Sequence, residues 1–266
     1  MSIASAEEIS FYQKCLNLGK RIDGRLSNQI RNFELFSGDH VVRTSNGSSR
    51  LHMAEENFTV LVGIKADVVH ITPESSDTSR VKLNICSSIS KNQSMLEKEY
   101  SEKLIEEITY YFQGTIDQYT ASSSLVLIEK KLAWNIYVDV YINGYLGYCN
   151  IDHLSYAIRA ALNSCGLPSL EINLNSVSNE YSFTVKEEIV KPFKNIVIPH
   201  LMVGGYHRGQ IYLDLTQRES FACEALFLAA VHANGDVSQL RKIGKLLLTQ
   251  MEETSNLKLS GQSSTN

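Results

Sequence analysis

The amino-acid sequence predicts a mixed fold of α-helices and β-strands in one compact unit. Segments in which apolar and polar residues alternate occur along most of the 266 residues and predict strands. Segments with apolar residues at helical spacing interrupt them and predict amphipathic helices. No linker is long or biased enough in composition to divide the chain cleanly, and no repeat of solenoid length is visible.

The first expected element is a helix from about Ala6 to Leu18, with acidic residues early, where they suit the helix dipole. Asn46-Gly47, between the strands expected at Val41–Thr44 and Arg50–Ala54, predicts the tight turn of a hairpin, because both residue types tolerate positive φ. Short alternating segments predict a twisted antiparallel sheet from Phe33–Phe36, Val41–Thr44, Arg50–Ala54, Phe58–Asp67 and Val81–Ile85.

A long amphipathic helix from Ser94 to Thr115 is expected to lie across this sheet. Two further strands are expected at Leu125–Ile128 and Ala133–Ile142. Asn143-Gly144 then predicts a turn, and Ile151–Ser164 predicts a helix with an apolar inward face, which a glycine and a proline end. The strand, the turn and the helix are expected to pack as one unit.

The remaining third of the chain alternates predicted strands with turn signals, and Asn234-Gly235 predicts a second hairpin. Lys245–Glu253 predicts a last helix, and the polar, serine-rich tail 254–266 predicts disorder. The strands expected here are Ile172–Leu174, Tyr181–Val185, Ile196–Val203, Ile211–Asp214, Ala222–Ala233 and Val237–Ile243.

The composition limits the possible functions. The formal net charge is −4 and the isoelectric point is about 6.0, so the chain lacks the basic excess with which an autonomous nucleic-acid-binding protein contacts phosphates. If it works on RNA, its charge must be pooled with that of partners.

No apolar run approaches the roughly 20 residues that cross a membrane, and the N-terminus lacks a signal-peptide pattern, so we expect an intracellular protein without a membrane partner. Five scattered cysteines predict buried reduced thiols.

The usual catalytic patterns are absent from the sequence. Asp152-His153 suggests a metal site, but the neighbours lie on different faces of a helix start and no ligand follows one turn later. We favour Asp152 as a helix N-terminal charge and expect no metal and no cofactor. No nucleophile elbow or phosphate-binding glycine loop is present. Two basic clusters leave open the choice between solvated surface charge and an RNA-facing role: Lys14, Lys20, Arg21, Arg25 and Arg31, and Arg241, Lys242 and Lys245.

The run Arg21-Ile22-Asp23-Gly24-Arg25 is different in kind. Two arginines bracket one aspartate and one glycine, which permits a compact bidentate ion pair while the glycine supplies backbone freedom. We therefore predict that Arg21, Asp23, Gly24 and Arg25 form a fixed joint between the first helix and the sheet.

Taken in order, several runs resemble the RNase PH family, and within it the RNase PH-like subunits of the eukaryotic RNA exosome core ring of the ribosomal RNA-processing protein 42 type. The resemblance implies an α+β, RNase PH-like fold (ribosomal protein S5 domain 2-like), with mixed sheets packed against helices in two layers. It covers about Glu7 to Glu253 and adds Asn46, Gly47 and Arg50 to the residues of a structural joint or subunit interface. The runs that carry it are Arg21–Arg25, Ser45–Arg50, Val60–Ala66, Trp134–Val140, Ile211–Gln217 and Arg241–Lys245.

In that family's terms, residues 1–20 form the N-terminal helix and residues 21–253 the RNase PH-like domain. The domain is expected as two βαβα-type halves with an approximate boundary near residue 190.

Active members of this family cleave RNA from its 3′ end with inorganic phosphate as the nucleophile, and this chain differs at the positions that do the chemistry. The phosphate-binding arginine, near a helix N-terminus that also favours an anion, falls on Tyr148. The two acids that handle protons and magnesium fall on Ser220 and Leu226. Without these charges, negligible activity is expected. Where active members carry RNA-binding arginines, only Lys91 and Lys98 supply positive charge.

The resemblance therefore implies a non-catalytic, structural subunit of the RNA exosome. Its expected partners are other RNase PH-like subunits in a hetero-hexameric ring, cap subunits with S1 and KH domains, a separate hydrolytic exoribonuclease and RNA threaded through the pore. The expected location is the nucleus and nucleolus, and also the cytoplasm. Two alternatives remain: a phosphate-dependent 3′–5′ exoribonuclease, and an unrelated intracellular enzyme or binding protein of similar architecture.

Overall fold

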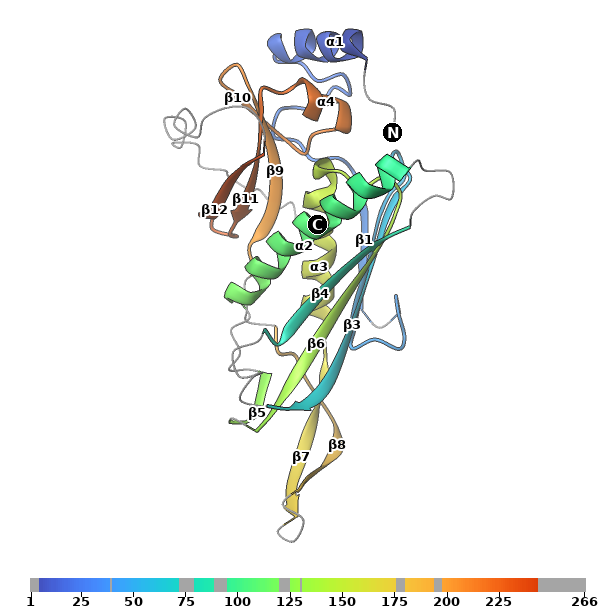
Figure 1. Ribbon diagram of the computed structural model, residues 1–266, viewed down its shortest axis with the longest axis vertical. Coiled ribbons are helices and arrows are strands. Elements are labelled where there is room, and N and C mark those ends of the chain that lie inside the picture. The colour runs from blue at the N-terminus through green and yellow to red at the C-terminus, as the bar shows by residue number, and fades with distance from the viewer. Residues whose placement is uncertain are drawn as a thin grey trace.

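Two main sheets enclose two long helices (Figure 1). The computed structural model describes residues 5–38, 40–71, 79–88, 95–119, 125–129, 131–175, 180–193 and 198–243. Among these residues, no helix is long and apolar enough to cross a membrane. The elements are α1 (Ala6–Asn17), β1 (Glu34–Ser37), β2 (Gly47–Met53), β3 (Phe58–His70), β4 (Val81–Ser87), α2 (Met95–Tyr119), β5 (Val126–Ile128), β6 (Leu132–Asn143), the 3₁₀ turn η3 (Tyr148–Asn150), α3 (Ile151–Ser164), β7 (Leu167–Asn175), β8 (Glu180–Val190), β9 (His200–His207), β10 (Gln210–Leu213), α4 (Gln217–Ala222), β11 (Ala225–Val231) and β12 (Val237–Ile243).

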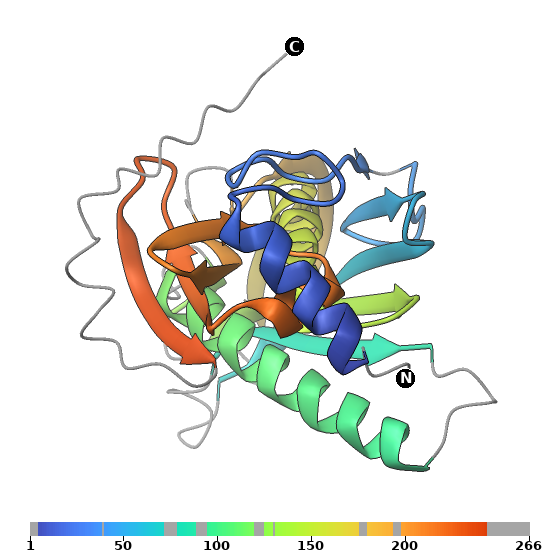
Figure 2. The same cartoon turned by 90° about the horizontal axis from the view of Figure 1, so that it is seen from above.

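The first sheet has the order β1-β2-β3-β6-β4, with β5 also paired to β6. Strand β4 runs parallel to β6, and the other neighbours are antiparallel. The second sheet, β10-β9-β11-β12, is antiparallel throughout. Helix α3 packs against β2 and β3 on one side and β9 on the other, while α2 lies along β4. The helices thus lie between the sheets, and none of the helices that the structure describes covers the outer face of the first sheet (Figure 2).

The core between the sheets follows from the two periodicities of the chain. In β3, Val60, Val62 and Ile64 are fully buried, and the residues between them turn to the other face. Helix α3 adds its predicted inward face, including Leu154 and Ile158, to the same layer. Burial of one such aliphatic side chain contributes roughly 1.5–3 kcal/mol, so this layer is the main stabilising part of the fold.

Most predicted elements occur near their predicted positions. The first helix, the helix Ile151–Ser164 and the strands on both sides of it are confirmed, with differences of a few residues at their ends. The Asn234-Gly235 turn is confirmed as well, since the His232 backbone N–H donates to the Asp236 carbonyl at 2.8 Å and joins β11 to β12. The predicted helix Lys245–Glu253 and the tail 254–266 lie outside the described residues.

Two predictions between β1 and β2 are wrong. Residues Val41–Thr44 form turns instead of a strand, and Asn46-Gly47 is not a hairpin turn. Gly47 begins β2, and the Asn46 backbone N–H donates to the Ile64 carbonyl at 2.7 Å. The hairpin turn lies instead just before β3, where Asn57 has a φ of 47°.

Close packing explains why a glycine stands at position 47. A Cβ there would lie 2.7 Å from the Cα of Cys165 and 2.8 Å from the carbonyl oxygen of Ala161. Beside it, the Asn46 carbonyl accepts the backbone N–H of Gly166 at 2.7 Å. Asn46 and Gly47 therefore fasten β2 to the C-terminal end of α3.

The sequence did not predict the short helix α4. The predicted strand Ala222–Ala233 begins in the last turn of α4, whereas β11 begins at Ala225. A capping box starts α4: the Glu219 backbone N–H donates to Thr216 Oγ1, and the Thr216 backbone N–H donates to the Glu219 carboxylate.

Gly47→Ala should reduce the free energy of unfolding by about 1–3 kcal/mol, because its Cβ overpacks the junction between β2 and α3. Gly63→Ala in β3 is the matched control, since a Cβ there meets nothing within 4 Å. Urea denaturation of the purified variants measures both effects. Equal stability of the two variants would contradict the packing role of Gly47.

Candidate functional site

The segment that follows α1 is built into the end of the second sheet. Leu16 of α1 packs against Tyr212 in a small separate core, and α1 contacts α4. Gly24, with a φ of 77°, helps to reverse the chain. The Leu213 backbone N–H then donates to the carbonyl of Ser27 at 2.7 Å, so this segment runs beside β10.

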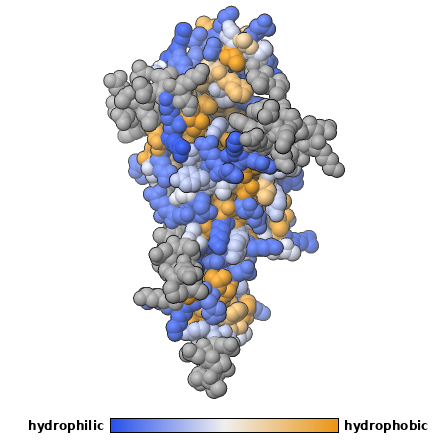
Figure 3. All heavy atoms as spheres, viewed as in Figure 1, coloured by the Kyte–Doolittle hydropathy of each residue, from blue (hydrophilic) through white to orange (hydrophobic). Residues whose placement is uncertain are grey.

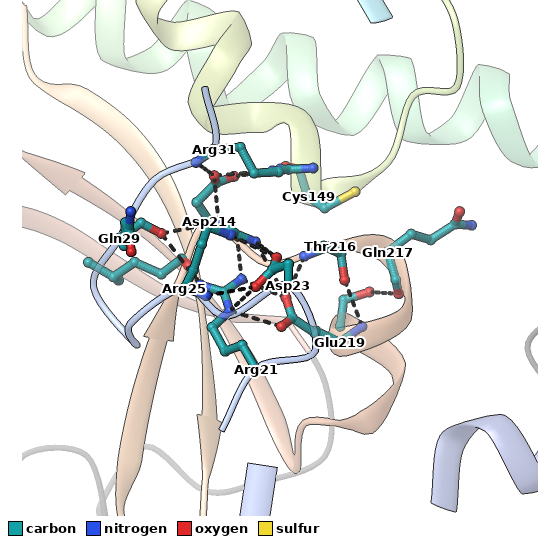
Figure 4. Close-up of polar contacts among 12 residues, drawn as sticks. Arg21, Asp23, Arg25, Gln29, Arg31, Cys149, Asp214, Thr216, Gln217 and Glu219 are labelled. Carbon is teal, nitrogen blue, oxygen red and sulfur yellow. Dashed lines mark hydrogen bonds and ion pairs between the residues drawn. The ribbon is translucent and has the colours of Figure 1, made fainter. Parts of the chain in front are cut away.

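Arg21 lies buried against α4 (Figure 4). Its Nε and Nη2 atoms donate to the two carboxylate oxygens of Glu219 at 2.9 and 2.6 Å. Its Nη1 and Nη2 atoms also donate to the carbonyls of Leu213 and Asp214 at 2.9 and 2.8 Å. Because a planar guanidinium can bind several acceptors in fixed directions, Arg21 holds the connection between β10 and α4 in one geometry.

Two more arginines of the segment that follows α1 donate hydrogen bonds to the carboxylate of Asp214. The backbone N–H and Nε of Arg31 donate to its carboxylate at 2.5 and 2.9 Å, and Arg25 Nη1 donates at 3.1 Å. Burial would raise the pKa of Asp214, but the hydrogen bonds and charge of Arg31 outweigh it and hold that pKa below its ordinary value of 3.8. Asp214 is therefore a buried, ionised carboxylate. Asp23 pairs with Arg25 at 2.8 Å beside it.

In the cluster of Arg21, Asp23, Arg25, Arg31, Asp214 and Glu219, three arginines face three carboxylates, and Arg31 also pairs with Glu56 at its edge. Arg21, Asp214 and Glu219 are only 5%, 1% and 2% exposed. Groups this deeply buried and fully engaged do not meet a substrate. The cluster therefore holds chain segments together, and the predicted run Arg21–Arg25 supplies half of its charged groups.

Asp152 and His153, at the start of α3, are also buried. Asp152 Oδ1 accepts the Val203 backbone N–H at 2.6 Å and so ties α3 to β9. Burial, and then the charge of Asp214, raises the pKa of Asp152 well above its ordinary value. Asp152 lies in the first turn of α3, as predicted, and its burial favours the neutral form of the carboxyl group there. Burial likewise lowers the pKa of His153 to about 4.

At the position where the resemblance places a phosphate-binding arginine, Tyr148 donates its hydroxyl to Glu107 of α2 at 2.5 Å. Tyr111, one helical turn further along α2, donates to the other oxygen of the same carboxylate at 2.7 Å. Burial and Glu107 raise the pKa of Tyr111 to about 12, so its hydroxyl keeps its proton. The Arg241 guanidinium lies 4.6 Å from the centre of the Tyr111 ring. A fixed carboxylate thus lies beside the start of α3.

The two positions expected to carry acids have structural contacts instead. Ser220 Oγ donates to the Gln217 carbonyl inside α4 at 2.7 Å. Leu226 of β11 packs against the small core around Leu16 and Tyr212. Neither side chain carries a carboxylate, so the acids expected of an active member are missing at these two positions.

The other predicted residues lie apart from this site. Lys91 is outside the described residues, and of Lys98 only the place in α2 is described. Arg50 is exposed on the outer face of the first sheet. Among the residues that the structure describes, no group of three or more histidine, cysteine or acidic side chains could hold a metal ion.

Two parts of the charge cluster were missed in the sequence. Glu219 and Asp214 lie about 190 residues from the arginines that bind them, and spacing along a chain does not report such contacts. The pattern Thr216-x-x-Glu219 was the available signal, because a capping box marks a helix start and places a carboxylate at its N-terminus.

Comparisons with known proteins agree with this geometry. The chain is 23% identical to the putative exosome complex exonuclease RRP42 of Dictyostelium discoideum over 92% of this chain and 89% of that protein. It is 29% identical to the exosome complex component rrp43 of Schizosaccharomyces pombe, over 58% of this chain and 56% of that one. No protein-family model matches the sequence.

Solved structures share the fold at low sequence identity. A chain of an archaeal exosome core superposes with a TM-score of 0.64 at 19% identity, over 94% of this chain and 91% of that chain. A chain of the Archaeoglobus fulgidus exosome with RNA bound to the active site gives a TM-score of 0.65 at 18% identity, over 94% and 92%. The predicted α+β, RNase PH-like fold is confirmed, as is the resemblance to exosome subunits of the ribosomal RNA-processing protein 42 type.

Arg21→Met should lower the free energy of unfolding by about 3–5 kcal/mol, because it leaves the buried Glu219 carboxylate without its cation. Arg218→Met in α4 is the control, because that side chain is 58% exposed and makes surface contacts with Glu8 and Tyr12. Guanidinium denaturation measures both variants. Similar losses for the two would show that the buried pair has no special role.

The free energy of unfolding of Asp152→Asn should rise relative to that of the wild type as the pH is raised from 4 to 7. In the wild type, burial raises the pKa of Asp152, so the folded state holds a proton that the unfolded chain releases above pH 3.8. The contribution of Asp152 to the free energy of unfolding therefore falls as the pH rises. Asparagine keeps an acceptor for the Val203 N–H without this cost. Urea titrations of both proteins at pH 5 and pH 7 give the difference. A larger deficit for Asp152→Asn at pH 7 than at pH 5 would contradict the neutral carboxyl.

Proposed function

We propose that this chain, an RNase PH-like exosome subunit by fold and by sequence similarity, is a non-catalytic member of the exosome core ring. In this role it helps to form the pore through which RNA reaches a separate 3′–5′ exoribonuclease. The two-sheet fold and the similarity to exosome components support the assignment as an RNase PH-like exosome subunit. The contacts of Tyr148 support the non-catalytic role.

The carboxylate of Glu107 is the observation that carries the non-catalytic role. Phosphorolysis needs a site that attracts inorganic phosphate and stabilises the charge of the transition state. Here the hydroxyls of Tyr148 and Tyr111 hold a negative charge in place. A second negative charge about 4 Å away would be repelled by roughly 4 kcal/mol at an effective dielectric constant near 20. Glu107 therefore opposes phosphate binding at this position, and Arg241 over the Tyr111 ring offsets part of that repulsion.

The charge distribution fits a role in an assembly. A chain with a net charge of −4 binds RNA poorly alone, whereas a ring can collect basic side chains from several subunits around one pore. In this proposal its partners are other RNase PH-like chains in a hetero-hexamer, cap proteins with S1 and KH domains, and a hydrolytic exoribonuclease. The proposed locations are the nucleus, the nucleolus and the cytoplasm.

Tyr148→Ala and the milder Tyr148→Phe should leave RNA degradation by the reconstituted complex unchanged, because the residue takes no part in the chemistry. Release of labelled nucleotides from a single-stranded RNA measures the rate, with the wild-type complex as reference. A tenfold loss with both variants, in complexes of normal subunit composition, would count against a non-catalytic role. Phosphate-dependent release of nucleoside diphosphates by the isolated wild-type chain would favour the phosphorolytic alternative.

A further inference from the structure

The β7–β8 ribbon separates its apolar and polar residues onto two faces. The strands pair antiparallel, with Leu170 opposite Val185 and Ile172 opposite Phe183. Directly opposed residues of a ribbon point to the same side, so these four apolar side chains share one face. The alternate positions form the other face, with Glu171, Asn173, Ser182, Thr184 and Lys186.

Much of the apolar face is uncovered. Phe183 is 51% exposed and Val185 is 62% exposed. Ile189 and Val190 are exposed as well, but they lie beyond a register shift in the pairing and, as adjacent residues, point to opposite sides of the ribbon, so they do not both belong to this face. Figure 3 shows hydrophobic surface at the end of the molecule where Figure 1 places the ribbon. Large aliphatic and aromatic side chains gathered on one exposed face indicate a surface that another molecule covers.

Among the described residues, the ribbon contacts the rest of the protein near its base and at one point along its length. β7 and β8 pair with each other and with no strand of the two larger sheets. Leu167 is buried and Leu170 packs against the main core, and Lys131 donates to the Tyr181 hydroxyl at 2.8 Å. An isolated two-stranded ribbon is marginally stable in water, so a partner on the apolar face would stabilise this one.

The chemistry of the ribbon favours a protein over RNA. Residues 167–191 include four glutamates and two lysines, and the apolar face has two aromatic residues, Phe183 and Tyr181, of which Tyr181 is already paired with Lys131 of this chain. An RNA-binding surface needs cations for phosphates and aromatic rings for bases. An acidic ribbon with one apolar face instead complements a protein surface that is apolar and bordered by basic groups.

We propose that the apolar face of the β7–β8 ribbon, centred on Phe183 and Val185, docks onto a neighbouring RNase PH-like chain in the ring. This rests on the proposed function and names one of the surfaces through which the chain enters the assembly.

The fold itself presents a surface of the complementary kind. On the outer face of the first sheet, a groove of about 850 Å³ is lined by apolar residues including Phe36, Leu61 and Tyr141, and Arg50 lies among them. Arg50, Leu61 and Tyr141 stand side by side on β2, β3 and β6. A ring requires two different surfaces on each chain. The acidic apolar ribbon and the apolar groove with its arginine are two such surfaces on this chain, of opposite charge and on different parts of the fold.

The test compares three full-length tagged proteins purified from the organism's own cells: wild type, Phe183→Asp and Thr184→Asp. Thr184 is the matched control, because it is exposed on the same strand but on the polar face. Native mass spectrometry measures the fraction of the chain in a ring-sized complex. Phe183→Asp should lower this fraction about tenfold or more, as expected for a buried interface anchor, whereas Thr184→Asp should match the wild type.

Circular dichroism and the melting temperature of each variant check that it is folded. If Phe183→Asp unfolds, Phe183→Ser serves in its place, because it removes the aromatic side chain without adding a charge. Assembly of Phe183→Asp and Phe183→Ser at the wild-type level, or equal loss with Thr184→Asp, would overturn the docking proposal and leave the ring role intact. Unchanged assembly with reduced RNA retention would assign the face to RNA and also overturn it. A wild-type chain found only as a monomer or as a dimer with itself would overturn the proposed function.

Discussion

The bidentate pair of Arg21 with Glu219, extended by Arg31 and Asp214, is the constraint on which the rest of the arrangement depends. It joins three parts of the chain that are remote in sequence, because Arg31 Nη2 also donates to the Cys149 carbonyl at 2.7 Å. The segment after α1, the start of α3 and the connection between β10 and α4 meet there. A buried network of this kind is costly to break, since each lost partner leaves an uncompensated charge.

This network also fixes the backbone beside two positions at which the resemblance places catalytic groups. Tyr148 is the neighbour of Cys149, and Ser220 is the neighbour of Glu219, so the charge cluster positions both residues. The buried partners join remote segments of the chain, whereas the two neighbours make contacts to Glu107 and Gln217. The stability of the cluster therefore does not depend on the side chains at positions 148 and 220.

The fold was largely predictable because its signals are local. The period-two segments of β3 and β6 and the apolar stripe of α3 each report one buried face, and the first helix has its Ser5–Glu8 capping box. Gly47 was misread because a glycine required by close packing against Cys165 is identical in sequence to one required by a turn. The cluster was half visible in Arg21–Arg25, but its carboxylates come from the far end of the chain, where only tertiary structure shows the pairing.

The arginines of the N-terminal segment form ion pairs within this chain. Arg21, Arg25 and Arg31 belonged to a basic group that the sequence left open as RNA-facing, and all three bind carboxylates of this same chain. Arg241, from the second basic group, lies over the Tyr111 ring beside Glu107. Side chains already paired in this way have little charge left to attract phosphates. In the proposed ring, these four arginines therefore add little positive charge to the path of the RNA, and neighbouring chains are a source of the charge that they do not supply.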